Sequence, residues 1–238
     1  MLVFFDDILV YSRTWDEHVW HLDTVLSILS RDSLFAKESK CDLGLSKLLC
    51  LGHIISAQGA CMDPEMIHAI IKWPTLVNLT QLRAFLGLCG FYRRLVSGYL
   101  RHAAPLTDLM RKGAFLWTLE AQECFDKFKE LMTSCPVLAL PDFSKHFELH
   151  CDASGEGVGA VLMQDKHPIA YESRKLKGPE RSFSIYDKEM LAIMHALAKF
   201  RQYLVGSKFS IKIDHNSLKH FLGLRDLNDT QQKWVSKL

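Results

Sequence analysis

Two groups of acidic residues in this 238-residue sequence are spaced so that they could hold a metal ion. The first group contains Asp152 and Asp214, each at the end of three alternating apolar residues, in 147–152 and 209–214. Alternation sends the apolar side chains to one face of a strand and the final carboxylate to the other. If the two strands are parallel neighbours, both carboxylates lie at the carboxyl edge of the sheet, where open α/β sheets bind ligands.

Glu189 lies between these strands, in a predicted helix, and is the third acid of the group. It is one residue away from the apolar stripe, so we expect it to face along the sheet edge rather than into solvent. Clustered carboxylates repel one another unless a cation neutralises them, and oxygen ligands of this kind suit Mg²⁺. A pair of such ions supports in-line phosphodiester cleavage. Spacing alone leaves a second interpretation open, in which Asp152 and Asp214 are turn residues and Glu189 is a surface helix residue.

The second group is Asp6-Asp7, which joins the apolar runs 3–5 and 8–11. This pattern predicts a β-hairpin with an acidic apex. Adjacent carboxylates there could hold Mg²⁺ for nucleotidyl transfer, and an ordinary solvated turn would have the same sequence.

The composition is that of a globular protein, with 48% hydrophobic and 24% charged residues. No apolar run is long enough for a membrane span, and the first residues lack the basic start of a signal peptide. Seven scattered cysteines without a CxxC pair indicate reduced, buried thiols in an intracellular protein. The pairs His18/His21 and His146/His150 lack a second ligand pair nearby, which favours surface or packing roles over metal binding.

The charge is unevenly distributed, although the net charge of the whole chain is only +2. Residues 64–114 carry a net charge of +5 and are flanked by acid-containing segments. Such a segment is compatible with a polyanionic partner and also with chance.

Several elements are predicted before the second strand-rich part of the chain. Apolar periodicity predicts helices over 15–31, from 80, and over 120–133, and Asp63-Pro64 predicts a further helix start. Strands are predicted around 34–36 and 49–56, with Gly59 as a turn signal after the second, and 136–145 is predicted to be a connector.

From His146 the pattern becomes strand, turn, strand, strand, helix, strand, helix, which is typical of an α/β domain. Ser184 with Asp187 predicts the start of the helix, whose apolar stripe runs to Leu204 before Gly206 ends it.

The ordered motifs resemble the Pol polyprotein of gypsy-type long-terminal-repeat retrotransposons over essentially the whole chain. Residues 3–12 resemble the aromatic-x-Asp-Asp motif of the reverse-transcriptase palm, and 51–55 resemble the hairpin that grips the primer. Motifs in 62–94, which include Phe91-Tyr92-Arg93-Arg94, are similar to the thumb. The resemblance implies metal-binding roles for Asp6 and Asp7, and contacts to nucleic acid by Gly52, His53, Arg93 and Arg94.

Three later motifs resemble those of the family's ribonuclease H domain: 151–162, 186–192 and 213–219. The resemblance implies that Asp152, Glu189 and Asp214 bind Mg²⁺, or Mn²⁺ in its place, and activate water against RNA paired with DNA. The 2′-hydroxyl and the shape of the hybrid would distinguish this substrate from duplex DNA. The resemblance implies an intracellular location, either in a cytoplasmic particle or in the nucleus.

The expected fold is α/β, or α+β overall, in four parts. These are a palm remnant with a primer-grip-like hairpin (1–63), a helical thumb (64–114), a connector (115–145) and an incomplete ribonuclease H-like mixed sheet with flanking helices (146–238). Compared with the family, the fingers, an upstream palm Asp and the fourth ribonuclease acid are missing. We therefore expect no polymerase activity from this chain alone, and weak or absent cleavage unless further Pol polypeptide completes the sites. The alternative is a nucleic-acid-binding remnant or a non-functional relic.

Overall fold

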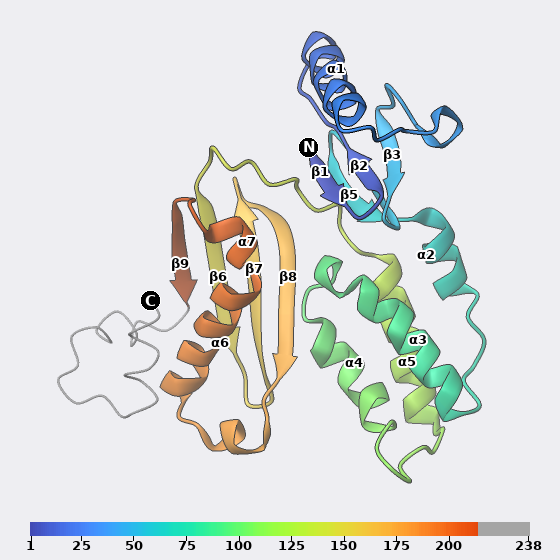
Figure 1. Ribbon diagram of the computed structural model, residues 1–238. Helices are drawn as coiled ribbons and strands as arrows, with labels where there is room; N and C mark the ends of the chain where they lie inside the picture. The colour runs from blue at the N-terminus through green and yellow to red at the C-terminus, as the bar shows by residue number, and fades with distance from the viewer. Residues whose placement is uncertain (214–238) are drawn as a thin grey trace, which may run out of the picture. The chain divides into compact units, whose positions relative to one another are not determined.

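The computed structural model describes residues 1–213 of the chain, in two compact units, Met1–Ala57 and one that starts at Gln58 (Figure 1). No helix among the described residues is long and apolar enough to span a membrane.

The first unit consists of two hairpins and one long helix. Strands β1 (Leu2–Phe4) and β2 (Asp7–Leu9) pair antiparallel, helix α1 spans Trp15–Arg31, and β3 (Lys47–Cys50) pairs antiparallel with β4 (His53–Ser56). A 3-10 turn, η1, spans Glu38–Lys40. No described side chain in this unit is buried.

Helix α1 begins where a capping box predicts a helix start. The hydroxyl of Thr14 accepts a hydrogen bond from Glu17 N–H, and the Glu17 carboxylate accepts one from Thr14 N–H. The strand predicted around 34–36 is wrong, because these residues have no regular structure. The predicted strand 49–56 is two strands, because Leu51 and Gly52 form a turn with positive φ angles of 48° and 71°.

The second unit begins with strand β5 (Gly59–Met62) and a bundle of helices. These are α2 (Pro64–Ile71), α3 (Leu79–Phe91), the 3-10 turn η2 (Arg93–Leu95), α4 (Tyr99–Asp108) and α5 (Leu119–Thr133). Asp63 caps α2 through a hydrogen bond from Glu65 N–H, with Pro64 at the first helical position as predicted. Aromatic rings fill the core of this bundle, including Phe85, Phe125 and Phe128.

Gly59, the predicted turn signal, directly follows a turn at residues 57–58 and is the first residue of β5. Its φ angle is +131°, and a Cβ atom there would lie 2.0 Å from the carbonyl oxygen of Leu138. Leu138 forms a two-bond antiparallel bridge with Ala60, with N···O distances of 2.8 and 2.9 Å. Glycine therefore permits the close approach of the segment after α5 to β5.

Up to residue 213, the second half of this unit forms a mixed sheet of four strands in the order β8-β7-β6-β9. Its strands are β6 (Phe147–Ala153), β7 (Gly157–Gln164), β8 (His167–Lys175) and β9 (Phe209–Ile213). Strands β6, β7 and β8 form an antiparallel meander, whereas β9 pairs parallel with β6. A short 3-10 helix, η3 (Gly178–Ser182), precedes helix α6 (Ile185–Lys199), which packs on β6 and β7.

The single helix expected to run to Gly206 is two helices. Helix α6 ends at Lys199, and α7 (Arg201–Leu204) follows it after Phe200. Phe200 is fully buried among the core residues beneath α6, so the break places this ring in the core. At the other end, Ser184 caps α6 by accepting a hydrogen bond from Asp187 N–H, as predicted.

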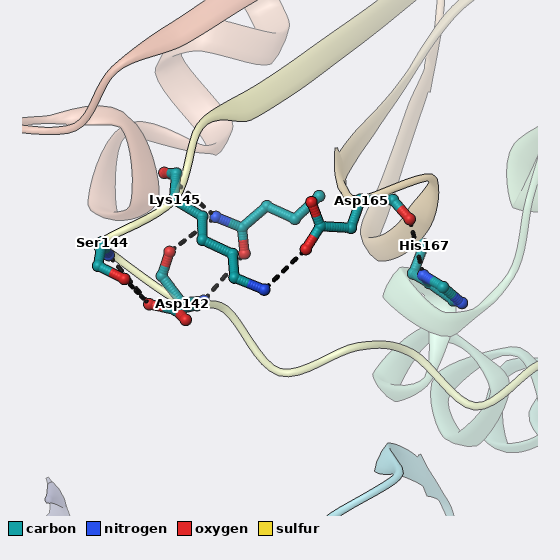
Figure 2. Close-up of polar contacts among 6 residues, drawn as sticks. Asp142, Ser144, Lys145, Asp165 and His167 are labelled. Carbon is teal, nitrogen blue, oxygen red and sulfur yellow. Dashed lines mark hydrogen bonds and ion pairs between the residues drawn. The ribbon is translucent and has the colours of Figure 1, made fainter.

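A polar clamp fixes the chain before β6 to the turn between β7 and β8 (Figure 2). The side-chain amide of Gln164, which is 5% exposed, donates to the carbonyl oxygen of Asp142 and accepts from Asp142 N–H, with distances of 2.8 and 2.9 Å. Lys145 forms an ion pair with Asp165 at 2.8 Å. Residues from Asp142 onward are therefore attached to the sheet before the first strand begins.

Candidate metal site at the sheet edge

Asp152 lies at the carboxyl end of the central strand β6, as the apolar alternation predicts. Phe147, Leu149 and Cys151 are buried under α6, and the intervening residues face the other side of the sheet. The side chain of Asp152 is exposed and makes no hydrogen bond or ion pair with another residue of 1–213. This carboxylate is accessible to a ligand.

Glu189 is 8% exposed and belongs to the buried face of α6, with Met190 and Ile193. The structure thus excludes the interpretation of Glu189 as a surface helix residue, and it places Glu189 deeper than the sideways position that we expected. Burying a carboxylate is costly unless hydrogen bonds or a positive charge compensate for it. Its position among apolar helix residues distinguishes it from an ordinary solvated glutamate.

Asp152 and Glu189 belong to the same end of the sheet. Figure 1 shows that α6 starts at the end of the sheet toward which β9 points, and β6 runs parallel to β9. Glu189 is in the second turn of α6, and Asp152 is the penultimate residue of β6. The predicted parallel pairing is confirmed up to Cys151 and Ile213, while Asp214 lies outside the described residues.

Cys151, the neighbour of Asp152, is a core residue and contributes no reactive group. It points to the α6 side and is 7% exposed. Burial raises the pKa of its thiol to about 12. At neutral pH it is therefore a protonated thiol and is unsuited as a nucleophile or as a metal ligand.

The acids of the first unit lie in a tight hairpin turn. Phe4 pairs with Asp7, so Phe5 and Asp6 form the two-residue turn and Asp7 begins β2. Both carboxylates are exposed. The hairpin prediction is confirmed, and the role of Asp6 and Asp7 as metal ligands stays a prediction.

The residues expected to contact nucleic acid lie in both units. Gly52 occupies the β3–β4 turn, and His53 begins β4, with its Nδ1 2.9 Å from the carbonyl oxygen of Leu51. Arg93 and Arg94 lie in η2, where Arg93 is exposed and Arg94 is half-buried.

The donor atoms at the sheet edge are of the chemical type that binds a divalent cation. Carboxylate oxygens are the ligands that Mg²⁺ prefers, and Asp152 and Glu189 supply them from two elements that meet at one edge. No group of three or more His, Cys, Asp or Glu side chains suited to a metal occurs within residues 1–213. The predicted third ligand, Asp214, lies outside the described residues.

Two polar contacts of the sheet could not be predicted from the sequence. The buried Glu172 on β8 and the partly buried His195 on α6 form a pair, with Nε2 and Oε1 3.1 Å apart. Glu148 on β6 accepts hydrogen bonds from Lys212 on β9 and His150 on β6. Only the strand register shows that Glu148 and Lys212, which are 64 positions apart, are neighbours.

A comparison with protein families identifies the second half of the chain. Residues 142–238 match the family model described as an RNase H-like domain found in reverse transcriptase. The match begins at Asp142, the residue at which the Gln164 clamp attaches the chain to the sheet.

Curated relatives match the whole chain. It is 37% identical to the retrovirus-related Pol polyprotein from transposon 297 of Drosophila melanogaster, over 100% of this chain and 23% of that protein. It is 33% identical to the corresponding polyprotein from transposon gypsy of the same organism, over 98% of this chain and 24% of that protein. The chain thus spans about a quarter of the length of these relatives.

Solved structures share the fold. The foamy viral protease-reverse transcriptase in complex with an RNA/DNA hybrid has a TM-score of 0.83 and 22% identity, over 95% of this chain and 32% of that one. The same enzyme in complex with dsDNA has a TM-score of 0.81 and 21% identity, over 96% of this chain and 50% of that one.

Proposed function

We propose that this chain, which belongs to the retrotransposon Pol family and carries an RNase H-like domain of the reverse-transcriptase type, binds RNA–DNA hybrids and hydrolyses their RNA strand. The main support is the position of Asp152 and Glu189 at one edge of the mixed sheet, at the end of β6 and the start of α6. The foamy viral protease-reverse transcriptase, which shares this fold, was solved in complex with an RNA/DNA hybrid, and we propose the same substrate class for this chain.

RNase H-like domains generally depend on a divalent metal ion, and we propose Mg²⁺, with Mn²⁺ as a substitute. Asp152, Glu189 and Asp214 would hold it, and the metal would supply charge stabilisation and an activated water. The exposed Asp152 is free to bind a cation at the surface, whereas Glu189 offers a carboxylate whose surroundings contain little water. Asp6 and Asp7 are proposed as the corresponding ligands of a polymerase site.

The proposed organisation keeps the palm remnant 1–63, the thumb 64–114 and the connector 115–145 before the RNase H-like part. In this scheme Gly52 and His53 contact the primer end, and Arg93 and Arg94 contact the backbone. The net charge of +5 on residues 64–114 supports a polyanionic partner for the thumb.

Cleavage of a labelled RNA–DNA hybrid in Mg²⁺ tests this function directly. The unaltered chain is expected to shorten the RNA strand only weakly and to leave the DNA strand intact. Asp152→Asn is expected to lower the rate by about 100-fold or more, because it removes a charged metal ligand without changing the size of the side chain.

Asp165→Asn is the matched control for this experiment. Asp165 is an exposed aspartate of the same sheet, at the β7–β8 turn near the opposite end of β6, where it pairs with Lys145. The control is expected to keep the full rate. Equal loss in both variants, or full activity in Asp152→Asn, would contradict the proposed site.

Hybrid binding without cleavage is the second candidate function, and the basic segment 64–114 favours it. Binding that weakens steeply with salt, together with an intact RNA strand in Mg²⁺ and in Mn²⁺, would support this candidate over hydrolysis.

A further inference from the structure

The face of the sheet opposite α6 carries a row of polar side chains next to Asp152. Glu148, His150 and Asp152 are the residues of β6 that alternate with its buried apolar residues. The parallel register pairs His150 with Lys212 of β9, so Lys212 lies on the same face. Residues two positions apart on a strand are about 6–7 Å apart. His150 therefore lies about that far from Asp152, toward the start of β6, and Lys212 extends the row onto β9.

Glu148 holds this row in place. Its Oε2 atom accepts hydrogen bonds from Lys212 Nζ at 2.6 Å and from His150 Nε2 at 3.1 Å. The bond from Lys212, and then that from His150, lowers the pKa of Glu148, which keeps this carboxylate ionised. An ammonium group has three donors, so the bond to Glu148 leaves Lys212 able to donate to another acceptor.

The row opens into a large cleft of the second unit. The cleft has a volume of about 1400 Å³ and lies between the start of α4 and the sheet. Asp152, His150 and Lys212 are among its lining residues, and Arg101 lines it on the helical side. The side chain of Lys212 is 54% exposed, so its ammonium group is accessible from the cleft.

We propose that Lys212 binds a backbone phosphate of the RNA strand, next to the phosphate that lies at Asp152. The inference rests on the proposed function, because it takes Asp152 as the place where the RNA strand is cut. A lysine two positions before the carboxylate position of its strand can reach the neighbouring phosphate of the RNA strand. A lysine ammonium binds phosphate as a point charge. Lys212 is therefore a substrate-positioning residue.

Glu148 sets the strength of this contact. Its carboxylate orients the Lys212 side chain and neutralises part of its charge, so the row attracts phosphate without carrying a full unpaired positive charge. It follows that removing Lys212 and removing the charge of Glu148 should change hybrid affinity in opposite directions.

The test measures binding of a labelled RNA–DNA hybrid by the full chain over a series of salt concentrations. Lys212→Gln is expected to weaken binding by about 3–10-fold and to make the slope of log affinity against log salt shallower by about 1, because one phosphate contact is lost. Glu148→Gln is expected to tighten binding by about 2–5-fold, because the charge of Lys212 is no longer partly neutralised.

The ion pair of Lys145 and Asp165 supplies matched controls. It has the same chemistry, with an Nζ to oxygen distance of 2.8 Å and a lysine side chain that is 52% exposed, but it lies at the β7–β8 turn. Lys145→Gln and Asp165→Asn are expected to leave affinity and slope unchanged.

The outcomes separate this inference from the proposed function. Hybrid binding with the same slope for Lys212→Gln as for Lys145→Gln would overturn the phosphate contact and leave the function standing. The predicted slopes without any RNA cleavage would support the contact and overturn hydrolysis. Absence of hybrid binding by the unaltered chain would overturn both.

Discussion

At the residue scale, the buried carboxylate of Glu172 joins the edge strand β8 to helix α6. It is 7% exposed, and its Oε1 atom accepts a hydrogen bond from His195 Nε2 at 3.1 Å. Burial alone would raise the pKa of Glu172, but the hydrogen bond from His195 and the positive charges of His195, Arg93 and Lys199 outweigh it and lower the pKa. The ionised form therefore stabilises the fold.

Glu172→Gln is expected to lower the free energy of unfolding at pH 7 by about 1–3 kcal/mol, because a charged acceptor of a buried hydrogen bond is lost. A carboxyl group with a lowered folded-state pKa stabilises the protein above its unfolded-state pKa of about 4.3, and this stabilisation is lost as the pH falls through the folded-state value. Between neutral pH and the acid range, Glu172→Gln should therefore lose less free energy of unfolding than the unaltered chain. Urea unfolding at several pH values measures this difference.

Glu156→Gln is the control for this pH series. Glu156 is exposed in the β6–β7 turn, so its change is expected to be within about 0.5 kcal/mol. Parallel stability curves for the unaltered chain and Glu172→Gln would contradict the role of the pair.

Single residues also show where prediction from sequence reaches its limit. The position of Asp152 followed from strand alternation, and the pairing of its strand with β9 followed from two similar patterns. The burial of Glu189 did not follow, because helical periodicity gives the direction of a side chain but not the depth to which the sheet covers it. Glu172 and His195 are 23 positions apart, and only tertiary packing brings them together.

At the element scale, the bridge between β5 and the segment after α5 depends on Gly59. Gly59 has a φ angle of +131° and no Cβ atom, so the Leu138 carbonyl can approach its backbone closely. The Ala60–Leu138 bridge forms next to this contact. This bridge closes the helical bundle, because it joins its first strand to the residues that follow its last helix.

Gly59→Ala is expected to lower the free energy of unfolding by about 2–4 kcal/mol, because the new methyl group would overlap the Leu138 carbonyl and strain the backbone. Gly87→Ala is the control, since no heavy atom lies within 4 Å of a Cβ at this position in α3. The control should stabilise the chain by about 0.5–1 kcal/mol in the same denaturant experiment. Equal effects of the two changes would show that the bridge does not need a glycine.

Helix starts were the most predictable elements, because their signal is local. Asp63 and Ser184 each cap a helix through their own side chains, as their sequence context indicates. The break at Phe200 and the strand role of Gly59 were missed, because the cause of each lies in a distant part of the chain. Phe200 turns into the core beneath α6, and Gly59 meets Leu138.

At the scale of the second unit, the helical bundle and the sheet are joined through the start and the end of α4. Gly98, the residue before α4, has no side chain to cap it, and Ser173 of β8 accepts the hydrogen bond from Leu100 N–H instead, at 3.2 Å. At the other end of the helix, Lys175 of β8 donates to both carboxylate oxygens of Asp108, at 3.1 and 3.3 Å. A strand thus caps a helix of the neighbouring layer, and the two layers are coupled.

The double change Ser173→Ala with Lys175→Gln should uncouple these layers. The cap contributes about 0.5–2 kcal/mol and the half-exposed ion pair less than about 1 kcal/mol, so the sheet itself stays folded while its attachment to α4 weakens. Limited proteolysis should then cut the segment 134–141, which follows α5, faster, and the thermal transition should broaden or split in two. Arg111→Gln is the control, because it removes an exposed 3.0 Å ion pair between Arg111 and Asp108 and leaves the contacts to β8 intact. If both variants kept the digestion pattern and the single transition of the unaltered chain, packing of Tyr171 against the bundle core would be the main attachment of the two layers.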